Sequence, residues 1–194
     1  MYVIGIAGGI GAGKSVVSRV LRSKGHEVYD CDSEARRMME ASNLLKADIA
    51  ARLGDSCISA DGSLDRREIA RCIFGDDSCR EWLNSRVHRM VREDVARKAA
   101  SKPCGVLFVE SAILKSSGLC YLCDRIWVVD ASEDVRIARA CARDGSDRDS
   151  VIARIEAQRD EESGFDDIPV DIIRNDGHCP VLPEIEKLLT FLKQ

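Results

Sequence analysis

Short apolar runs alternate along this chain with longer segments in which apolar residues recur every three or four positions. The short runs predict five strands, at residues 2–7, 26–29, 106–109, 125–129 and 170–173. The longer segments have the period of helices that bury one face, and they lie at residues 16–21, 33–41, 44–53, 65–74, 78–100, 133–143, 150–162 and 183–192. Strands that alternate with helices indicate an α/β fold with a five-stranded parallel sheet flanked by helices.

The alternation is interrupted between residues 33 and 100, where helical segments follow one another with no convincing strand. This stretch is too long for a simple crossover between two strands. It predicts either a subdomain that holds a second substrate or a helical pack that only stabilises the protein. We therefore divide the chain into a core of residues 1–32, 101–135 and 165–194, a helical subdomain at 33–100 and a helical lid at 136–164.

A glycine-rich loop follows the first predicted strand. Gly8–Ser15 fits the phosphate-binding template G-x-x-x-x-G-K-[ST] and lies between a strand and a helix, as that template requires. Glycines let successive backbone N–H groups turn inward around an anion, and the next helix adds the positive end of its dipole. Lys14 would then contact the β- and γ-phosphates and the Ser15 hydroxyl would ligate Mg²⁺. The alternative is a glycine-rich turn with a chance lysine.

Acidic residues stand at the carboxyl ends of three predicted strands. Asp30 and Asp32 follow the second strand, Glu110 the third and Asp130 the fourth. Ligands of open parallel sheets bind beyond these strand ends. Glu110 and Asp130 are therefore both candidates for a carboxylate directed at Mg²⁺, while Asp32 is either a functional carboxylate or the N-cap of the helix at 33–41.

Arginines recur every three or four residues in the late helix at 133–143, at Arg136, Arg139 and Arg143. This spacing can place them on one helical face. Together with the helix at 150–162 they predict a mobile cover that brings positive charge to a transferring phosphoryl group and excludes water. A solvated face balanced by neighbouring acidic residues is the alternative.

The composition narrows the possible partners and location. The formal net charge of -4 gives no case for nucleic-acid binding. No window approaches the roughly eighteen apolar residues of a membrane span. The chain enters its first strand without a signal peptide, so we expect a cytoplasmic protein. We expect its nine cysteines to be reduced and to act mainly as small buried apolar groups, because Cys120-x-x-Cys123 lacks a second pair at zinc spacing.

These features together resemble the dephospho-coenzyme A kinase family. The glycine loop alone is shared by many kinases, but the other matches make the resemblance specific, and they run through essentially the whole chain. The matching segments are Gly8–Ser15, Asp30-Cys31-Asp32, Asp61-Gly62-Ser63-Leu64-Asp65-Arg66, Phe74, Val128-Val129-Asp130, Arg139–Asp144, Ala157-Gln158 and Asn175-Asp176-Gly177.

The resemblance implies a P-loop kinase fold and transfer of the ATP γ-phosphoryl group to the ribose 3′-hydroxyl of dephospho-coenzyme A. Mg²⁺ would be held at Ser15, and Lys14 and Arg139 would offset charge on the moving group, with Arg143 beside them. The residues implied in nucleotide binding are Gly11, Ala12, Gly13, Lys14, Ser15, Val16, Arg143 and Asn175.

The resemblance also assigns the acceptor side. Asp32 would orient or deprotonate the 3′-hydroxyl, and the subdomain at 33–100 would bind dephospho-coenzyme A, with Arg66 as a candidate for its phosphates. The carboxylate that supports Mg²⁺ stays open between Glu110, Asp130 and Asp32. The expected partner is this small molecule, and the expected assembly is a monomer or weak oligomer.

Four positions depart from the family pattern. Val16 stands where a threonine is usual, Arg89 replaces the proline after His88, and Arg136 stands where glutamine is common. The family's glutamate after the third strand is absent from residues 112–116. The nearest alternative is another P-loop kinase that acts on a nucleoside monophosphate or a shikimate-like alcohol. A nucleotide-dependent switch protein is the alternative from another class, but the chain lacks the N-K-x-D that a GTPase needs.

Overall fold

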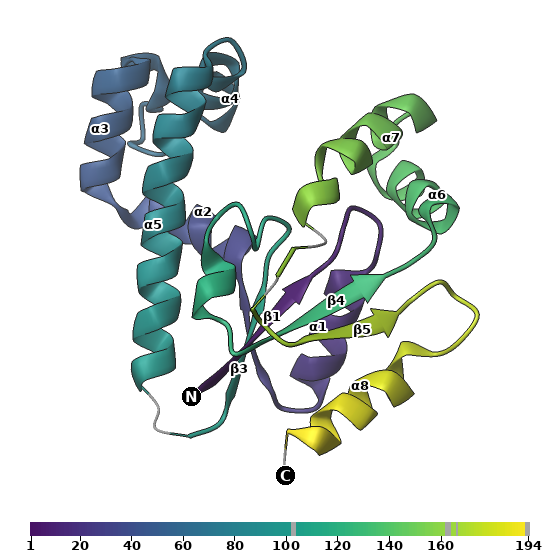
Figure 1. The fold of residues 1–194 in the computed structure, drawn as a ribbon. Helices are drawn as coiled ribbons and strands as arrows, with labels where there is room; N and C mark the ends of the chain where they lie inside the picture. Colours follow the sequence, from purple (N-terminus) through teal and green to yellow (C-terminus); the bar gives the residue numbers. More distant parts are fainter. Residues whose placement is uncertain (102–103, 162–163, 166, 193–194) are drawn as a thin grey trace. The chain divides into compact units, whose positions relative to one another are not determined.

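A computed structural model describes residues 1–101, 104–161, 164–165 and 167–192. Five strands form one sheet in the order β2-β3-β1-β4-β5, and every neighbouring pair is parallel (Figure 1). The predicted α/β fold with a five-stranded parallel sheet is confirmed. The strands are β1 (Tyr2–Ala7), β2 (Glu27–Asp30), β3 (Val106–Glu110), β4 (Arg125–Asp130) and β5 (Val170–Arg174).

The strand that carries the glycine loop is central in the sheet. β1 pairs with β3 on one side, where Ile6 is in register with Glu110, and with β4 on the other, where Ala7 is in register with Val128. The loop after Ala7 therefore leaves the sheet between the carboxyl ends of β3 and β4. Central parallel strands are covered on both faces, which explains why β1 is an almost unbroken apolar run.

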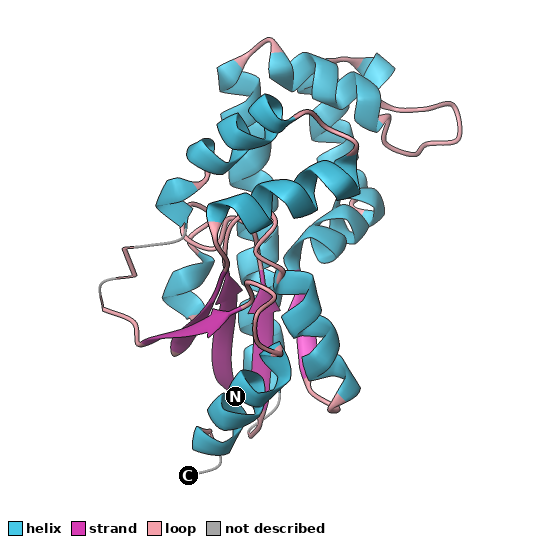
Figure 2. Ribbon diagram, turned by 90° about the vertical axis from the view of Figure 1, so that its right-hand side faces the viewer, coloured by secondary structure: helices cyan, strands magenta, loops and turns pink. Residues whose placement is uncertain are grey.

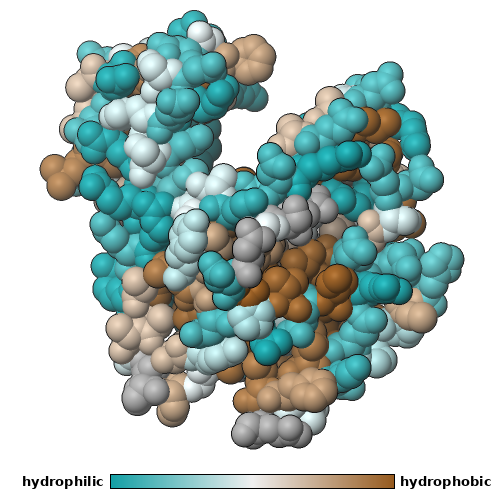
Figure 3. Space-filling view, in the orientation of Figure 1, coloured by the Kyte–Doolittle hydropathy of each residue, from teal (hydrophilic) through white to brown (hydrophobic). Residues whose placement is uncertain are grey.

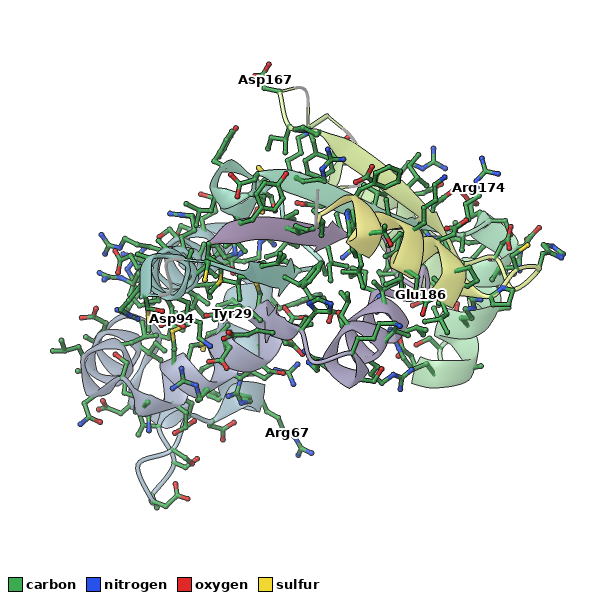
Figure 4. The ribbon with its side chains drawn as sticks, turned by 90° about the horizontal axis from the view of Figure 1, so that it is seen from below. Tyr29, Arg67, Asp94, Asp167, Arg174 and Glu186 are labelled. Atoms are coloured by element: carbon green, nitrogen blue, oxygen red, sulfur yellow. The ribbon has the colours of Figure 1, made fainter. Side chains whose placement is uncertain are left out.

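The two faces of the sheet are covered by different segments. On one face, α1 (Lys14–Ser23) and α8 (Val181–Phe191) pack over the central strands, and Figure 2 shows the strands as one layer. Lys24, just after α1, pairs with Glu186 on α8 at 2.6 Å. Figure 4 labels Glu186 on that helix. On the other face, Leu114 and Cys123 lie against Gly5, so the segment that includes the 3₁₀ turn η2 (Leu119–Leu122) covers it.

Two further helices belong to the sheet-bearing part of the chain. α6 (Glu133–Asp144) and α7 (Arg148–Ala157) pack together through a small apolar cluster of their own, against which Ile10 of the glycine loop also packs. The 3₁₀ turn η3 (Arg159–Glu161) follows. None of the helices in the described part of the chain is long and apolar enough to cross a membrane.

The chain divides into two compact units, one formed by Met1–Asp30 with Val95–Gln194 and the other by Cys31–Asp94. The second, helical unit has its own core, to which Leu45, Ile49 and Leu83 contribute. All its residues are described, and they contain an isolated bridge between Ile58 and Leu64 but no strand. Its helices are α2 (Cys31–Ala41), α3 (Asn43–Leu53), η1 (Asp55–Cys57), α4 (Arg66–Phe74) and the first part of α5 (Asp77–Ser101).

Two local predictions need correction. α2 begins at Cys31, so Asp32 lies inside its first turn and is not its N-cap. The helix predicted at 150–162 ends at Ala157, because the Gln158 N–H bonds back to the carbonyl of Ile155 in a tighter turn. Its predicted last residue, Glu162, lies outside the described residues.

Candidate active site

Close packing holds the glycine loop in one shape. Gly8, Gly11 and Gly13 have positive φ angles of 140°, 78° and 101°, which side-chain-bearing residues rarely adopt. A Cβ at each position would also lie closer than 3.0 Å to a neighbouring atom. Those atoms are Val129 O, Arg136 O and Asn175 Nδ2, respectively. Glycine is thus required at these positions for two reasons: the backbone has a positive φ angle, and there is no room for a Cβ.

Lys14 begins α1 and is folded over the loop. Its Nζ donates to the carbonyl oxygens of Gly8 and of Gly9, the latter at 3.3 Å. Gly13 is the N-cap of α1 and has no side chain to cap it, and the first turn contains no acidic residue. Backbone N–H groups at a helix start and a lysine ammonium are both suited to an anion such as a phosphate.

Ser15 and Val16 complete the motif. Ser15 is exposed in the first turn of α1, as a hydroxyl that ligates a metal must be. Val16 is half-buried, and its N–H donates to Gly13 O at 2.9 Å. Valine thus keeps the backbone geometry of the turn and lacks only the hydroxyl.

Asn175, just after β5, braces the loop from a distant part of the chain. Its Nδ2 donates to the Ala12 carbonyl at 2.8 Å, and its own carbonyl accepts from Arg139 at 2.7 Å. Its backbone N–H donates to Asp130 O at 2.7 Å. The structure therefore brings together Ala12, Arg139 and Asn175, three of the residues that the sequence resemblance singled out.

Arg136 has a structural role that we did not predict from the sequence. It is only 7% exposed, and its Nε donates to the Ile10 carbonyl at 3.0 Å. Its neighbours on the buried face of α6 are Ile137 and Ala140. The signal in the sequence was this position in an apolar stripe, where an arginine needs a partner because a buried charge is costly. Arg136 is thus a brace of the loop, whereas Arg139 is half-buried and Arg143 is exposed.

Arg143 is paired at the end of α6. Its Nε and Nη2 donate to the two carboxylate oxygens of Asp144 at 2.6 and 2.9 Å, and Asp144 also accepts from Arg154 on α7 at 3.0 Å. Arg143 and Arg154 hold the pKa of the Asp144 carboxyl well below its usual range. The charge of Arg143 is thus partly offset, in contrast to Arg139, which donates to a neutral carbonyl.

Carboxylates at the strand ends flank the loop-bearing strand. Glu110 ends β3 half-buried, in register with Asp30 at the end of β2, and Asp130 ends β4 exposed. Among the described residues, no group of three or more His, Cys, Asp or Glu side chains could hold a metal ion. A metal here would depend on a hydroxyl, one or two carboxylates, water and ligand oxygens, which suits Mg²⁺.

The helical unit positions the two acceptor-side candidates on helix starts. Asp32 is exposed in the first turn of α2. Arg66 is the exposed first residue of α4, and its Nη2 lies 3.5 Å from the Arg36 carbonyl. Asp61 accepts from the Ser63 N–H and hydroxyl at 3.0 and 2.7 Å, and Asp65 caps α4 through the N–H groups of residues 67 and 68. The Asp61–Arg66 segment is therefore a turn stabilised by its own side chains.

Known proteins share these features over most of the chain. The family model for dephospho-CoA kinase matches residues 2–180. The dephospho-CoA kinase of Porphyromonas gingivalis is 39% identical over 163 residues, which cover 84% of this chain and 80% of that protein. A crystal structure from Thermus thermophilus is 32% identical with a TM-score of 0.77, covering 98% of this chain and 95% of the other. A Campylobacter jejuni dephospho-CoA kinase structure, 19% identical over 98% and 96% of the two chains, shares the fold with a TM-score of 0.73. The chain belongs to the dephospho-CoA kinase family.

Proposed function

We propose that this protein transfers the γ-phosphoryl group of ATP to the ribose 3′-hydroxyl of dephospho-coenzyme A, which gives coenzyme A in the last step of its biosynthesis. The observation that carries the proposal is the family match over residues 2–180, which includes the phosphate loop and the whole helical unit. The loop by itself supports only a phosphate site, because many kinases share it.

The loop and Lys14 would bind the triphosphate. The loop Gly11–Val16 would hold the triphosphate through backbone N–H groups, and Lys14 would exchange its contacts with the carbonyls of Gly8 and Gly9 for phosphate oxygens. Exchanging neutral partners for anionic ones strengthens a charge-assisted hydrogen bond. Arg136 and Asn175 would act through the loop by keeping its shape.

The residues present fit a bound Mg²⁺. The Ser15 hydroxyl would ligate it, and Glu110, Asp130 or Asp32 would support it through a carboxylate. The bound ion would offset negative charge on the β- and γ-phosphate oxygens.

Arg139 and Arg143 would supply further positive charge from α6. Arg139 lies beside the loop through Asn175, and it would contact the γ-phosphate of the bound nucleotide. We propose that residues 136–164 act as a lid that excludes water during transfer. Arg143 would contribute less than Arg139, because Asp144 already binds it in a bidentate pair.

The helical unit would bind the acceptor. Asp32 would orient or deprotonate the 3′-hydroxyl, since an alcohol is a weak nucleophile near neutral pH. Arg66 would contact acceptor phosphates, and residues 33–100 would hold the pantetheine arm. Phe74 is 92% exposed and Leu44 is 83% exposed, so both offer apolar surface to that arm.

Acceptor choice tests the proposal. Purified protein with ATP and Mg²⁺ should consume ATP with dephospho-coenzyme A and leave nucleoside monophosphates and shikimate unchanged. Phosphorus–proton correlation NMR of the product should place the new phosphate on the ribose 3′ carbon. Turnover of a nucleoside monophosphate in place of dephospho-coenzyme A would overturn the assignment, and a phosphate at another position would overturn the 3′ specificity.

We also propose that the protein acts in the cytoplasm, where ATP and the free acceptor are available, as a monomer or weak oligomer. This proposal assigns every residue of the site to a single chain, so we expect activity without a partner subunit. Sedimentation velocity at micromolar concentration should show mainly the 21.4 kDa species, and activity per chain should not depend on protein concentration.

A further inference from the structure

A cavity in the helical unit has a wall rich in arginine. Its volume is about 400 Å³, and it is lined by five residues of α5, namely Trp82, Ser85, Arg86, Arg89 and Arg92. None of the described residues of this wall is acidic. Figure 3 shows that the surface of the helical unit is mainly hydrophilic. The phosphoryl transfer proposed above assigns no role to these five side chains.

The three arginines of the wall form a row along the helix. Arg86, Arg89 and Arg92 follow one another at intervals of three residues, which is a rise of about 4.5 Å per interval and about 9 Å over the row. Residues three positions apart are neighbours on a helix surface, and like charges placed there repel each other. An anion bound between the guanidinium groups would relieve this repulsion.

Neighbouring groups hold the first arginine of the row in place. Arg86 Nη1 lies 3.1 Å from Asp48 Oδ2 on α3, and its guanidinium carbon lies 5.0 Å from the ring centre of Trp82. Arg52, also on α3, lies over the same ring at 5.6 Å. A side chain that is already ordered loses less conformational entropy when a ligand binds. This end of the row is therefore preorganised.

The middle of the row is open to a ligand. Arg89 is exposed, and it makes no hydrogen bond or ion pair within the described part of the chain. A guanidinium presents its N–H donors in a planar fork that matches two oxygens of one phosphate. Arg89 can thus bind an anion without giving up an existing contact. It stands where the family pattern has a proline, so the row is not one of the motifs that the family shares.

We propose that this cavity binds a short chain of linked phosphates, either free or as the tail of a nucleotide. Successive phosphates would face Arg86, Arg89 and Arg92. A single phosphate would use only part of a row of about 9 Å. The formal net charge of -4 disfavours a long polyanion such as nucleic acid, and the cavity volume is that of a small-molecule site.

NMR of the Trp82 indole N–H tests this site, because Trp82 lines the cavity and the phosphate loop lies in the other unit. The probe is tripolyphosphate without Mg²⁺, and the controls at equal ionic strength are inorganic phosphate and citrate, a carboxylate anion. In ¹⁵N-labelled protein, Trp82→Phe identifies the signal, since the chain has two tryptophans. We expect tripolyphosphate to shift this signal in a saturable way, and both controls to bind about tenfold more weakly.

Two variants remove the same charge at different places in the helical unit. Arg89→Ala should weaken the binding of tripolyphosphate about tenfold, because a charge-assisted hydrogen bond is lost. Arg67→Ala removes an exposed arginine of α4, which Figure 4 labels, and should leave the binding unchanged. Asp48→Asn should strengthen the binding, because Arg86 loses the carboxylate that competes with the ligand.

The outcomes separate a built site from general attraction between charges. Equal weakening by Arg89→Ala and Arg67→Ala, citrate binding as tight as that of tripolyphosphate, or no saturable shift would overturn the proposal. ATP read on the same signal distinguishes the two sources of the ligand: tighter binding than tripolyphosphate indicates a nucleotide, and equal or weaker binding indicates a free phosphate chain. The readout needs no phosphoryl transfer, so its failure would leave the proposed function standing.

Discussion

The phosphate loop and the Asp61–Arg66 turn both depend on glycine, but for different reasons. Gly11 and Gly62 have nearly the same φ, 78° and 80°. A Cβ on Gly11 would meet the backbone of Arg136, whereas a Cβ on Gly62 would have nothing within 4 Å. The loop is therefore fixed by remote segments packed against it, and the turn is fixed by its own neighbours in sequence.

This difference separates the donor side of the proposed reaction from the acceptor side. The loop depends on Arg136 and Asn175, which are far away in sequence, so its geometry is a property of the whole sheet-bearing unit. The turn depends on Asp61 and Asp65 within itself. Substitutions near the loop should thus affect folding and catalysis together, and substitutions in the turn should have smaller, more local effects.

The largest expected effect is on the loop lysine. Lys14→Ala should lower kcat/KM for ATP by about 10³-fold, because a preorganised charge on the phosphates is lost. Steady-state kinetics with varied ATP measure this. The matched control is Lys24→Ala, just after the other end of α1, where the lysine pairs with Glu186. Full activity of Lys14→Ala would remove the loop from the mechanism.

The next effect tests the acceptor side. Asp32→Asn should bind ATP nearly normally and lose turnover by about 10²-fold or more, because the neutral amide cannot accept the hydroxyl proton. Glu34→Gln is the control, since both acids lie in the first turn of α2 and interact with the same helix dipole. Near-normal turnover of Asp32→Asn, or an equal loss in both variants, would contradict a role as base.

Alanine substitutions at the two glycines test the structural comparison directly. Gly62→Ala should destabilise by about 1–2 kcal/mol, the cost of a positive φ alone. Gly11→Ala carries that cost and a further 1–3 kcal/mol, roughly, from overpacking against Arg136. Urea unfolding of both variants at neutral pH measures the difference. Equal losses of unfolding free energy would show that remote packing does not constrain the loop.

The smallest effect concerns the local brace of the turn. The hydrogen bond from the Ser63 hydroxyl, and then that from its N–H, lower the pKa of Asp61. A lowered carboxyl pKa stabilises the fold above the unfolded-state pKa of about 3.9, and this contribution is lost as the pH falls through the folded-state pKa. Asp61→Asn, which resembles the protonated acid, should thus cost a little stability at pH 7 and progressively less below about pH 4. Urea midpoints across this range would contradict the idea if the difference stayed constant.

Much of this arrangement is local enough to be predicted from the sequence. The short runs predicted all five strands. The central strands β1, β3 and β4 are largely buried and keep mainly apolar sequences, whereas the edge strands β2 and β5 are less buried and include charged residues. The motif at Gly8–Ser15 predicted the phosphate loop, because the residues that form this loop are adjacent in the sequence. The role of Arg136 was harder to predict. Its buried hydrogen bond to the Ile10 carbonyl depends on tertiary packing, which the spacing of apolar residues does not show.

The cysteines show the same limit. All nine are free, and seven are buried or half-buried, as expected for small apolar groups, but Cys104 and Cys179 are exposed. Burial raises the pKa of the Cys123 thiol to about 12, so the Cys120-x-x-Cys123 pair contains a protonated, unreactive thiol. Whether a given cysteine is buried depends on which segments pack against it. The cysteines are scattered along the sequence without a period, so their positions do not predict their burial.

The bond between Asn175 and Ala12 joins residues 163 positions apart, and this separation has a consequence during synthesis of the protein. At about 5–20 residues per second, Ala12 is made roughly ten to thirty seconds before Asn175. Through that interval the nascent chain carries a glycine loop without its brace. The brace of the loop is therefore completed only after Asn175 has been translated, so a nascent chain that stops before this residue has an unbraced loop.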